Sequence, residues 1–514
     1  MKKVYDDPIP ILVGVGQVTQ REEDPLKALS PMDLTAVAAR RAAKDTGVGE
    51  KIFPILDTIV KIRSFSDTSW RFKCPFGKYI NPPKSLANRL GADNAKRLIY
   101  THPGGNIPQW SVNRLFEMIR RNEISAALIA GGEALSTQKT AQRTGIKLDW
   151  SEDPGGTFEE WGIGKQGWSE MEERHGMMSA ICAYPMVENA IRRHKGKTID
   201  EHMVNMGRLF ERFARVAASN QLADRRNGFS ADMIATVNEK NPFIGFPYTK
   251  LMNANVFIDQ SAALVLMSTT RAKELGIPKD KWVYLHGCCD ANDHWYLSER
   301  INFHSSPAMQ TVATITTKMA GMTMDKIDYM DIYSCFPSAV QIACAEMGID
   351  ENDPRELTVT GGLPYFGGPG NNYVTHSIAE MLDTLRAKPG TYGLVTANGW
   401  YLTKQSAGIY STAIPENHFL PVDPATYQSK IDANKGPEIV EHAEGPAEIE
   451  TYTVMHDRKG PSFSILFGRL NDDRRFIANT PLDIDLLMEM ETKDFLGCKG
   501  RVTTKDGKNT FIPN

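Results

Sequence analysis

The fold is decided by the stretch Leu128-Ile129-Ala130-Gly131-Gly132-Glu133-Ala134-Leu135-Ser136. An apolar run that ends in two glycines is typical of a buried strand of an α/β sheet that stops at a tight turn. Upstream, the loop His102–Asn106 contains two glycines and precedes a helix pattern that places Val112, Phe116 and Ile119 on one face. Glycine loop, helix, apolar strand and small-residue turn therefore follow one another in this order.

The same succession recurs in the second half of the chain. The loop Gly367–Asn371 contains three glycines and precedes a helix pattern with Val374, Ile378 and Met381 on one face. The run Gly393–Gly399 follows and is apolar up to its last two residues. A repeat of this kind predicts two related βα halves. Because any two βα units share part of the pattern, the residues alone leave two unrelated units open as well.

Four segments are indicated by the patterning along the chain. Residues 1–136 and 251–413 alternate short apolar runs with amphipathic helix patterns, the rhythm of α/β architecture. Residues 137–250 interrupt this rhythm with a Gly-, Trp- and Met-rich stretch and a long charged helix, which predicts a large insertion or lid. After a proline-rich linker, residues 424–514 contain short strand patterns separated by Gly and Asp turns and predict a small β domain.

Composition argues against several classes of function. The 514 residues contain 59 Lys and Arg against 62 Asp and Glu, so the net charge of −3 gives no electrostatic reason to expect a nucleic acid partner. The apolar run Ile9–Val15 is too short to span a membrane. Seven scattered cysteines form neither a disulfide framework nor a pair of metal clips. We therefore expect a cytoplasmic protein without a metal site.

Several segments resemble motifs of the thiolase superfamily. The stretch quoted above is similar to the thiolase strand that runs into Ala-Gly-Gly-x-Glu-x-Met-Ser, and Asp331–Phe336 resembles the sterol-carrier-protein branch, which has His-Asp-Cys-Phe there. Gly361–Pro369 lies where thiolases carry Gly-Gly-x-x-x-x-Gly-His-Pro, and Ala397–Gly399 lies where they carry Cys-x-Gly. The C-terminal segment, with Thr453–Asp457 and Gly468-Arg469, is similar to that of the bacterial thiolase-like type 1 proteins. The resemblance covers nearly the whole chain.

The resemblance implies a fold and a class of substrate. It implies an α/β thiolase fold, in which two duplicated βα halves form a five-layer αβαβα core that carries the inserted and C-terminal segments. It also implies acyltransferase chemistry of the acetyl-CoA acetyltransferase type, acting on acyl-CoA in lipid metabolism. Coenzyme A is then a substrate or ligand, no cofactor is tightly bound, and the protein is expected to form a homodimer through the core.

The residues that a thiolase uses for catalysis are missing. The place of the nucleophilic cysteine falls on Gly105-Asn106-Ile107, that of the Gly-His-Pro histidine on Gly368, and that of the second cysteine on Asn398. In the remaining motif Tyr333 stands in place of histidine and Ser334 in place of aspartate. Claisen chemistry on a thioester needs a thiolate, a base and oxyanion donors. The ordinary thiolase mechanism is therefore not expected here.

The glycine loops retain the features of a binding site. Backbone N–H groups at glycine loops and helix N-termini can hold an oxyanion or a phosphate without help from side chains. Asparagine side chains can add further donors. The residues predicted to bind the CoA thioester are Gly105, Asn106, Gly367, Gly368, Asn371 and Asn372.

Tyr333 is predicted to be the principal proton-transfer residue, with Tyr365 beside it and Asn398 supporting the thioester oxygen. This hypothesis rests on elimination, since Tyr333 is the titratable replacement inside an otherwise recognisable motif. The alternative for each tyrosine is a buried ring whose hydroxyl is hydrogen-bonded. Because the pKa of tyrosine starts near about 10, catalysis near neutral pH would require nearby positive charge or strong donors to lower it.

Three functions remain open from the sequence. The first is an acyl-CoA enzyme of the acyltransferase class with a displaced mechanism. The second is a thiolase-fold lyase that cleaves a β-hydroxyacyl-CoA by retro-aldol chemistry, because some thiolase-fold side-chain aldolases carry tyrosine at the place of Tyr333. The third is a non-catalytic CoA-ester binder. An acyl adduct on a cysteine such as Cys335 favours the first, lyase activity the second, and binding without turnover the third.

Overall fold

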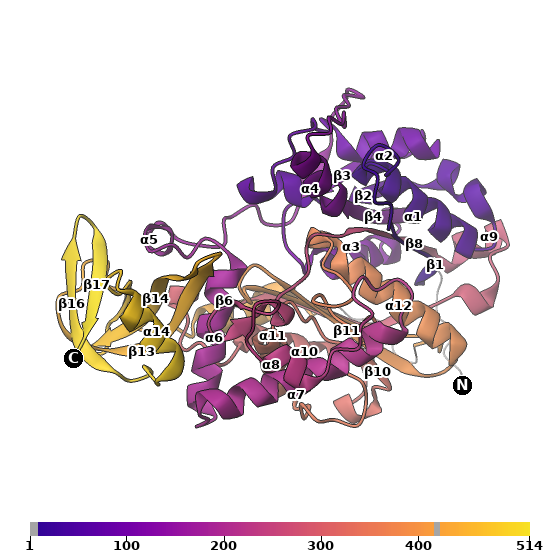
Figure 1. The fold of residues 1–514 in the computed structure, drawn as a ribbon. Helices are drawn as coiled ribbons and strands as arrows, with labels where there is room; N and C mark the ends of the chain where they lie inside the picture. Colours follow the sequence, from indigo (N-terminus) through magenta and orange to yellow (C-terminus); the bar gives the residue numbers. More distant parts are fainter. Residues whose placement is uncertain (1–8, 416–421) are drawn as a thin grey trace.

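Two β-sheets form the centre of the molecule in the computed structural model, which describes residues 9–415 and 422–514 (Figure 1). The first sheet has six strands in the order β1-β8-β4-β2-β3-β5. β1 and β4 each pair antiparallel with β8, whereas β4, β2, β3 and β5 run parallel to one another. The strands are β1 (Pro10–Thr19), β2 (Thr58–Lys61), β3 (Arg97–Thr101), β4 (Ala126–Ala134), β5 (Glu159–Trp161) and β8 (Asp259–Ser268).

The second sheet repeats the arrangement of the first. Its order is β10-β11-β12-β9, where β9 pairs antiparallel with β12, β12 antiparallel with β11, and β11 parallel with β10. In the first sheet, β1 pairs antiparallel with β8, β8 antiparallel with β4, and β4 parallel with β2. The same three pairings recur in the second sheet, so the predicted duplication is confirmed. The strands are β9 (Tyr284–Asn292), β10 (Tyr329–Asp331), β11 (Tyr392–Gly399) and β12 (Lys404–Ser411).

Helices complete five layers. Helices α3 (Ile107–Arg120) and α12 (Tyr373–Ala387) contact each other and strands of both sheets, so they form the middle layer. Helix α1 (Pro31–Asp45), with α2 (Pro82–Leu90), covers the first sheet, and α10 (Pro307–Ala320), with α11 (Pro337–Met347) beside it, covers the second (Figure 1). The predicted αβαβα core is thereby confirmed.

The helix faces follow the sequence pattern. Val112 and Ile119 of α3, and Val374 and Ile378 of α12, are fully buried because they fall on the faces that pack between the sheets. Helix α1 begins where Ser30 accepts a hydrogen bond from the Asp33 amide. Strands of a five-layer core are covered on both faces, which is why their residues are apolar without alternation.

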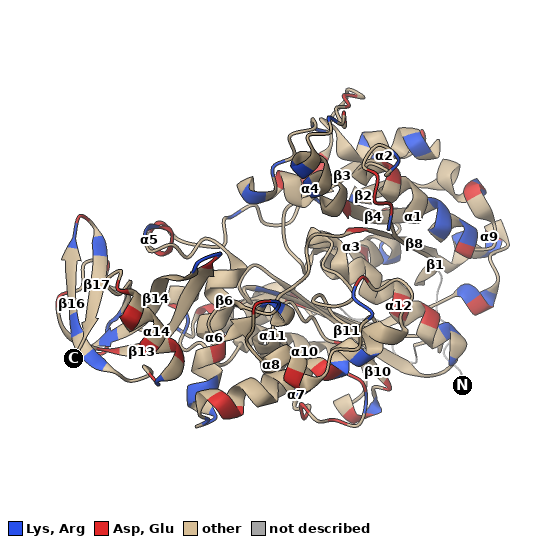
Figure 2. Ribbon diagram, viewed as in Figure 1, with Lys and Arg blue, Asp and Glu red and all other residues tan. Residues whose placement is uncertain are grey.

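The segment between the two parts of the core is mostly helical. Its helices are α4 (Leu135–Thr144), α5 (Glu170–Arg174), α6 (Ala180–His194), α7 (Ile199–Ser219) and α8 (Ala231–Ala235), and α9 (Thr269–Leu275) follows β8. Helix α7 is the predicted long charged helix, and a Thr198–Glu201 capping box starts it. Arginines lie close to Glu211 along this helix, and Asp200 and Glu201 stand in its first turn (Figure 2). Among the described residues, no helix is long and apolar enough to cross a membrane.

The C-terminal β unit takes strands from the insertion. Its sheet has the antiparallel order β15-β14-β13-β16-β17, and β6 of the insertion pairs with β13. The separate β domain expected from the sequence is therefore partly built from the insertion. The elements are β6 (Phe243–Gly245), β7 (Tyr248–Thr249), α13 (Pro424–Asp432), β13 (Gly445–Asp457), β14 (Gly460–Leu470), β15 (Arg475–Ala478), α14 (Ile484–Thr492), β16 (Lys499–Lys505) and β17 (Lys508–Pro513).

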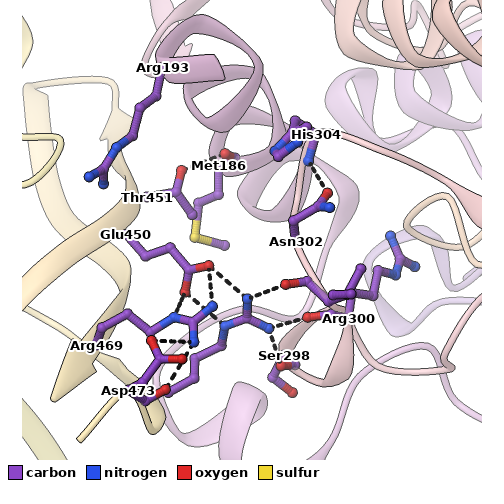
Figure 3. A network of polar contacts seen from close by, with 12 residues as sticks. Met186, Arg193, Ser298, Arg300, Asn302, His304, Glu450, Thr451, Arg469 and Asp473 are labelled. Carbon is purple, nitrogen blue, oxygen red and sulfur yellow. Dashed lines mark hydrogen bonds and ion pairs between the residues drawn. The ribbon is translucent and has the colours of Figure 1, made fainter. Parts of the chain in front are cut away.

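A polar network joins the C-terminal sheet to the core. Figure 3 shows Glu450 and Arg469 of the sheet close to Ser298 and Arg300 of the core. The fully buried Arg475 donates to both carboxylate oxygens of Glu450 (2.7 and 2.8 Å), to the Ser298 carbonyl (2.8 Å) and to the Arg300 carbonyl. Burial alone would raise the pKa of Glu450, but hydrogen bonds from Arg475 and Arg469 lower it. Glu450 is therefore held as a carboxylate at neutral pH.

We expect Arg475→Met to destabilise the protein by roughly 3–5 kcal/mol, because removal of one partner leaves the others of a buried ion pair uncompensated. A fall in the urea midpoint of unfolding measures this effect. The matched control is Arg474→Met, since Arg474 is an exposed neighbour that pairs with Asp472. A midpoint of the Arg475 variant equal to that of the control would contradict the role given to this network.

Candidate functional site

The two glycine loops meet, and asparagine side chains hold them together. The Gly104 amide donates to Asn371 Oδ1 (2.9 Å), and Asn371 Nδ2 donates to the Arg63 carbonyl (2.8 Å). Asn372 Nδ2 donates to the Gly131 carbonyl (2.7 Å). Both asparagines were predicted to bind CoA, but their amide groups are engaged with the protein instead. Their contacts fix the position of the first loop relative to α12.

Tyr333 fills the space that a side chain would occupy in the first glycine loop. A β-carbon on Gly105 would stand 2.1 Å from Tyr333 Oη and 2.5 Å from the Asn398 carbonyl oxygen. These separations are far below van der Waals contact, so a residue larger than glycine does not fit beside Tyr333. The loss of the loop cysteine and the gain of a tyrosine at position 333 are therefore linked through packing.

Burial keeps Tyr333 protonated. Its side chain is almost fully buried, and its ring meets that of Tyr373 edge-on, with 5.7 Å between centroids. Burial, followed by the nearby Cys335, raises the pKa of Tyr333 well above its ordinary value. This direction is opposite to the lowering that a catalytic base would require. Tyr333 is thus suited to donate a hydrogen bond or a proton at neutral pH.

Asn398 offers an acceptor to the site. Its Nδ2 donates to Tyr184 Oη (2.9 Å), while the hydroxyl of Tyr184 donates to the Trp400 carbonyl (3.1 Å), which fixes the orientation of the amide. Asn398 Oδ1 and Asn106 Oδ1 are buried and have no hydrogen-bond partner among the described residues. The sequence predicted that Asn398 would donate to a thioester oxygen. The free atom is instead an oxygen, which can accept from a ligand hydroxyl or amide.

Lys404 is the titratable group that the sequence reasoning missed. It begins β12, is 3% exposed, and its Nζ donates to the Pro103 carbonyl (2.5 Å). A β-carbon on Gly104 would stand 2.7 Å from this Nζ, so the amine touches the first glycine loop. Burial lowers the pKa of Lys404 to about 7, and no opposing charge offsets the burial in the described part of the chain. A neutral amine, which can act as a base, is therefore available near neutral pH.

The cysteines do not supply a thiolate. Burial raises the pKa of all seven thiols, and that of Cys335, the cysteine in the Tyr333 motif, rises to about 12. Because the thiolate is the reactive form, these thiols are poor nucleophiles at neutral pH.

Residues 162–168 of the insertion pack on His102 and Trp400, which flank the site. β-carbons on Gly164 and Gly167 would stand 2.7 Å from the His102 ring and 2.5 Å from the Trp400 ring. The backbone of Trp400 has φ of 55°, a conformation that is strained for a bulky residue. A cavity of about 10 Å³ remains between Tyr333 and Asn398. This volume holds about one water molecule, so the cavity must widen before a thioester can enter.

Tyr365, Gly367 and Gly368 lie apart from this group. The Tyr365 ring is fully buried against Phe210 and Phe229, with centroid separations of 6.2 and 5.8 Å, and its hydroxyl has no partner among the described residues. Burial raises the pKa of Tyr365 well above its ordinary value. Gly367 packs on Gln260, and the Gly368 amide donates to a main-chain carbonyl. Among the described residues, no ring contact joins Tyr365 to Tyr333, whose ring meets Tyr373 instead.

Among the residues that the structure describes, no group of three or more His, Cys, Asp or Glu side chains is placed to hold a metal ion.

A solved structure of a related protein matches this chain over its full length. The chain is 34% identical to a monomeric SCP2-thiolase-like protein type 1 from Mycobacterium smegmatis, with 99% of this chain and 100% of that chain covered and a TM-score of 0.85. Residues 426–508 match the family model of the thiolase-like protein type 1 additional C-terminal domain.

Matches to other proteins are partial or distant. Acetyl-CoA acetyltransferase 1 of Arabidopsis thaliana is 31% identical over 28% of this chain and 32% of its own length. A 3-ketoacyl-CoA thiolase of Shigella boydii is 28% identical over 28% of this chain and 35% of its own. The chain therefore spans about a third of the curated relatives that it matches. The solved structure of an Ltp2-ChsH2 aldolase, at 15% identity and a TM-score of 0.56 over 78% of this chain and 97% of its own, shares the fold.

Proposed function

The chain belongs to the SCP2-thiolase-like type 1 proteins, and we propose that it binds acyl-CoA thioesters and acts on them without an acyl-cysteine intermediate. One observation carries this proposal. Around the first glycine loop, the Tyr333 hydroxyl and the Lys404 amine occupy the surroundings of the missing cysteine, while every thiol has a raised pKa. The machinery suits proton transfer rather than acyl transfer through sulfur.

The reaction that fits these groups is cleavage of a β-hydroxyacyl-CoA. The neutral Lys404 amine takes the proton of the β-hydroxyl, and the bond between the α and β carbons breaks. An aldehyde or ketone leaves, and the bonding electron pair passes into the thioester as an enolate. The Lys404 ammonium then returns its proton to the α carbon, which releases a shortened acyl-CoA. Atoms and charges balance without a cofactor.

Tyr333 and the free amide oxygens have distinct tasks in this reaction. A protonated Tyr333 donates to the thioester oxygen as the enolate forms, which is the role of an oxyanion-hole donor. Asn398 Oδ1 and Asn106 Oδ1, which have no partner in the part of the chain that the structure describes, can accept from the β-hydroxyl or from the amides of the pantetheine arm.

The acyltransferase class, which is the leading expectation from the resemblance, has less support. It needs an acceptor for the acyl group, and raised thiol pKa values do not provide one. The homodimer also has no support from the M. smegmatis relative, which is described as monomeric. A cytoplasmic location, a role in lipid metabolism and the division into four domains stay predictions from the sequence.

Product analysis tests the proposal. The full chain is incubated with a series of 3-hydroxyacyl-CoAs, beginning with 3-hydroxybutyryl-CoA, and the mixture is analysed by liquid chromatography and mass spectrometry. We expect a shortened acyl-CoA and an equal amount of aldehyde or ketone. Butyryl-CoA is the matched control, because it lacks the hydroxyl and should bind without being cleaved. Binding of the whole series without cleavage would contradict the lyase reaction, and formation of acetoacetyl-CoA from acetyl-CoA would revive the acyltransferase.

A further inference from the structure

A second and larger cavity lies in the N-terminal half, where Glu133 and Arg63 of its lining meet Gly370 and Asn371 of the second glycine loop. Its volume is about 400 Å³, within the range of small-molecule sites, and it shares no lining residue with the small cavity at Tyr333. It lies among β2, β3, β4 and α4, in the upper part of Figure 1. Lys61 ends β2, Tyr100 is the next-to-last residue of β3, and Glu133 is the next-to-last residue of β4. The cavity therefore sits at the carboxyl ends of three parallel strands, where α/β sheets commonly bind ligands.

Two buried ionisable groups of opposite charge face this cavity without pairing. Lys61 and Glu133 are 1% and 3% exposed. Lys61 Nζ donates to the Ile62 carbonyl (3.0 Å), and Glu133 Oε1 accepts from the Phe65 amide (2.8 Å). In the ranges 9–415 and 422–514, the two side chains form no ion pair with each other. Burial lowers the pKa of Lys61, against the opposing effect of Glu133, and burial raises the pKa of Glu133. Such groups are costly to bury unless something completes their contacts.

The neighbouring charged groups are already engaged. Asp67 accepts from Tyr100 Oη (2.7 Å). Arg63 donates to the Thr101 carbonyl (2.6 Å) and to Glu160 (2.6 Å). Lys61 and Glu133 are therefore the deep charged groups left for a ligand.

Aromatic side chains stand among polar ones in the walls between these groups and solvent. Tyr79, Tyr100 and Trp150 line the cavity, and Trp70, which is 73% exposed, stands at its rim. An exposed tryptophan beside a cavity gives a flat apolar surface on which a ligand can lie. The aromatic part of the wall thus suits an apolar body, and the deep end suits two polar groups.

We propose that this cavity binds a small organic acid with an apolar body, whose carboxylate pairs with Lys61 and whose amine or hydroxyl donates to Glu133. A zwitterionic amino acid and the corresponding hydroxy acid both meet this requirement. The proposal does not depend on the lyase reaction, because it concerns a different cavity.

Four related probes separate the contributions of the two groups. Phenylalanine carries a carboxylate and an amine, and phenyllactate carries a carboxylate and a hydroxyl. The carboxylate-only control is 3-phenylpropionate, and the amine-only control is phenethylamine. Binding to the full chain is measured by isothermal titration calorimetry. We expect phenylalanine or phenyllactate to bind at least roughly 10-fold more tightly than both controls, because each control lacks one of the two charge-assisted hydrogen bonds.

Variants test the assignment to residues. Lys61→Met should weaken binding of phenylalanine and phenyllactate roughly 10-fold or more, and Glu133→Gln should weaken phenylalanine more than phenyllactate. Trp70→Ala changes an exposed side chain, so it tests the cavity even if a buried variant does not fold. Lys51→Met, at an exposed lysine that does not line the cavity, is the control. The proposal is overturned if none of the four probes saturates the protein, if 3-phenylpropionate binds as tightly as phenylalanine and phenyllactate, or if Trp70→Ala binds like the control variant.

Discussion

Lys404→Met is expected to lower kcat/KM for cleavage of a β-hydroxyacyl-CoA by roughly 100- to 10,000-fold, the range found when a general base is removed. Methionine keeps most of the volume of the side chain but has no lone pair of comparable basicity. Because Lys404 contacts the loop rather than the CoA arm in our account, binding of butyryl-CoA should change little. Lys404→Arg is the matched control, since arginine keeps the charge, has no neutral form at this pH, and should be as inactive. Wild-type turnover by either variant would exclude Lys404 as the base.

The pH dependence follows from the lowered pKa of Lys404. The base is the neutral amine, so kcat/KM of the wild type should rise with pH up to about 7 and level off above it. The folded state binds fewer protons than the unfolded chain, in which the lysine pKa is about 10.4. Burial of Lys404 therefore costs stability that grows as pH falls from about 10 to about 7 and stays constant below that. Lys404→Met should be more stable than the wild type at neutral pH, by an amount on the order of 3 kcal/mol in urea unfolding. Loss of activity with a gain in stability is typical of a residue kept for function.

Tyr333→Phe is expected to lower turnover roughly 100-fold or more while leaving KM for the CoA ester little changed. The variant keeps the ring against Tyr373 and removes only the hydroxyl that faces Gly105. Since the pKa of Tyr333 is raised, the hydroxyl acts as a donor and its loss should not move the rise of kcat/KM near pH 7.

Tyr365→Phe provides the matched control for this experiment. The Tyr365 hydroxyl is buried and has no partner among the described residues, so its removal should leave turnover unchanged. Equal losses of turnover in the two variants would show that removal of any buried tyrosine hydroxyl disturbs the packing enough to lower activity. The donor role of Tyr333 would then be wrong.

The sequence predicted the core because the relevant pattern is local. The helix faces at Val112 and Val374 and the glycine loops before them recur at matching places in the chain, and periodicity reports burial directly. The joining of β6 to β13 could not be predicted in this way, because pairing between distant strands leaves no local pattern. Strands β16 and β17 were not predicted individually. In β16, exposed charged residues such as Lys499 and Arg501 alternate with few buried residues, so the sequence has no clear apolar pattern there.

The candidate site was only partly predictable for a similar reason. The tyrosine at position 333 and the absence of a cysteine side chain at Gly105 are visible in the sequence as departures from the thiolase motifs. In the structure the Tyr333 hydroxyl packs directly on Gly105. Lys404 and Lys61 look like ordinary lysines in the sequence, because their unusual property is burial, which depends on the whole fold. Tyr365 was placed beside Tyr333 because both flank motifs. In the structure, however, Gly361 and Gly362 have φ of 109° and 77°, and the ring of Tyr365 packs against α7.

The central claim is that this protein acts on CoA thioesters without forming an acyl-cysteine. Mass spectrometry of the intact protein during turnover of 3-hydroxybutyryl-CoA, with rapid acid quenching, tests this claim most directly. We expect the mass of the chain to stay constant while the CoA ester is cleaved. An increase by the mass of an acyl group that peptide mapping assigns to a cysteine, Cys335 above all, would contradict the account.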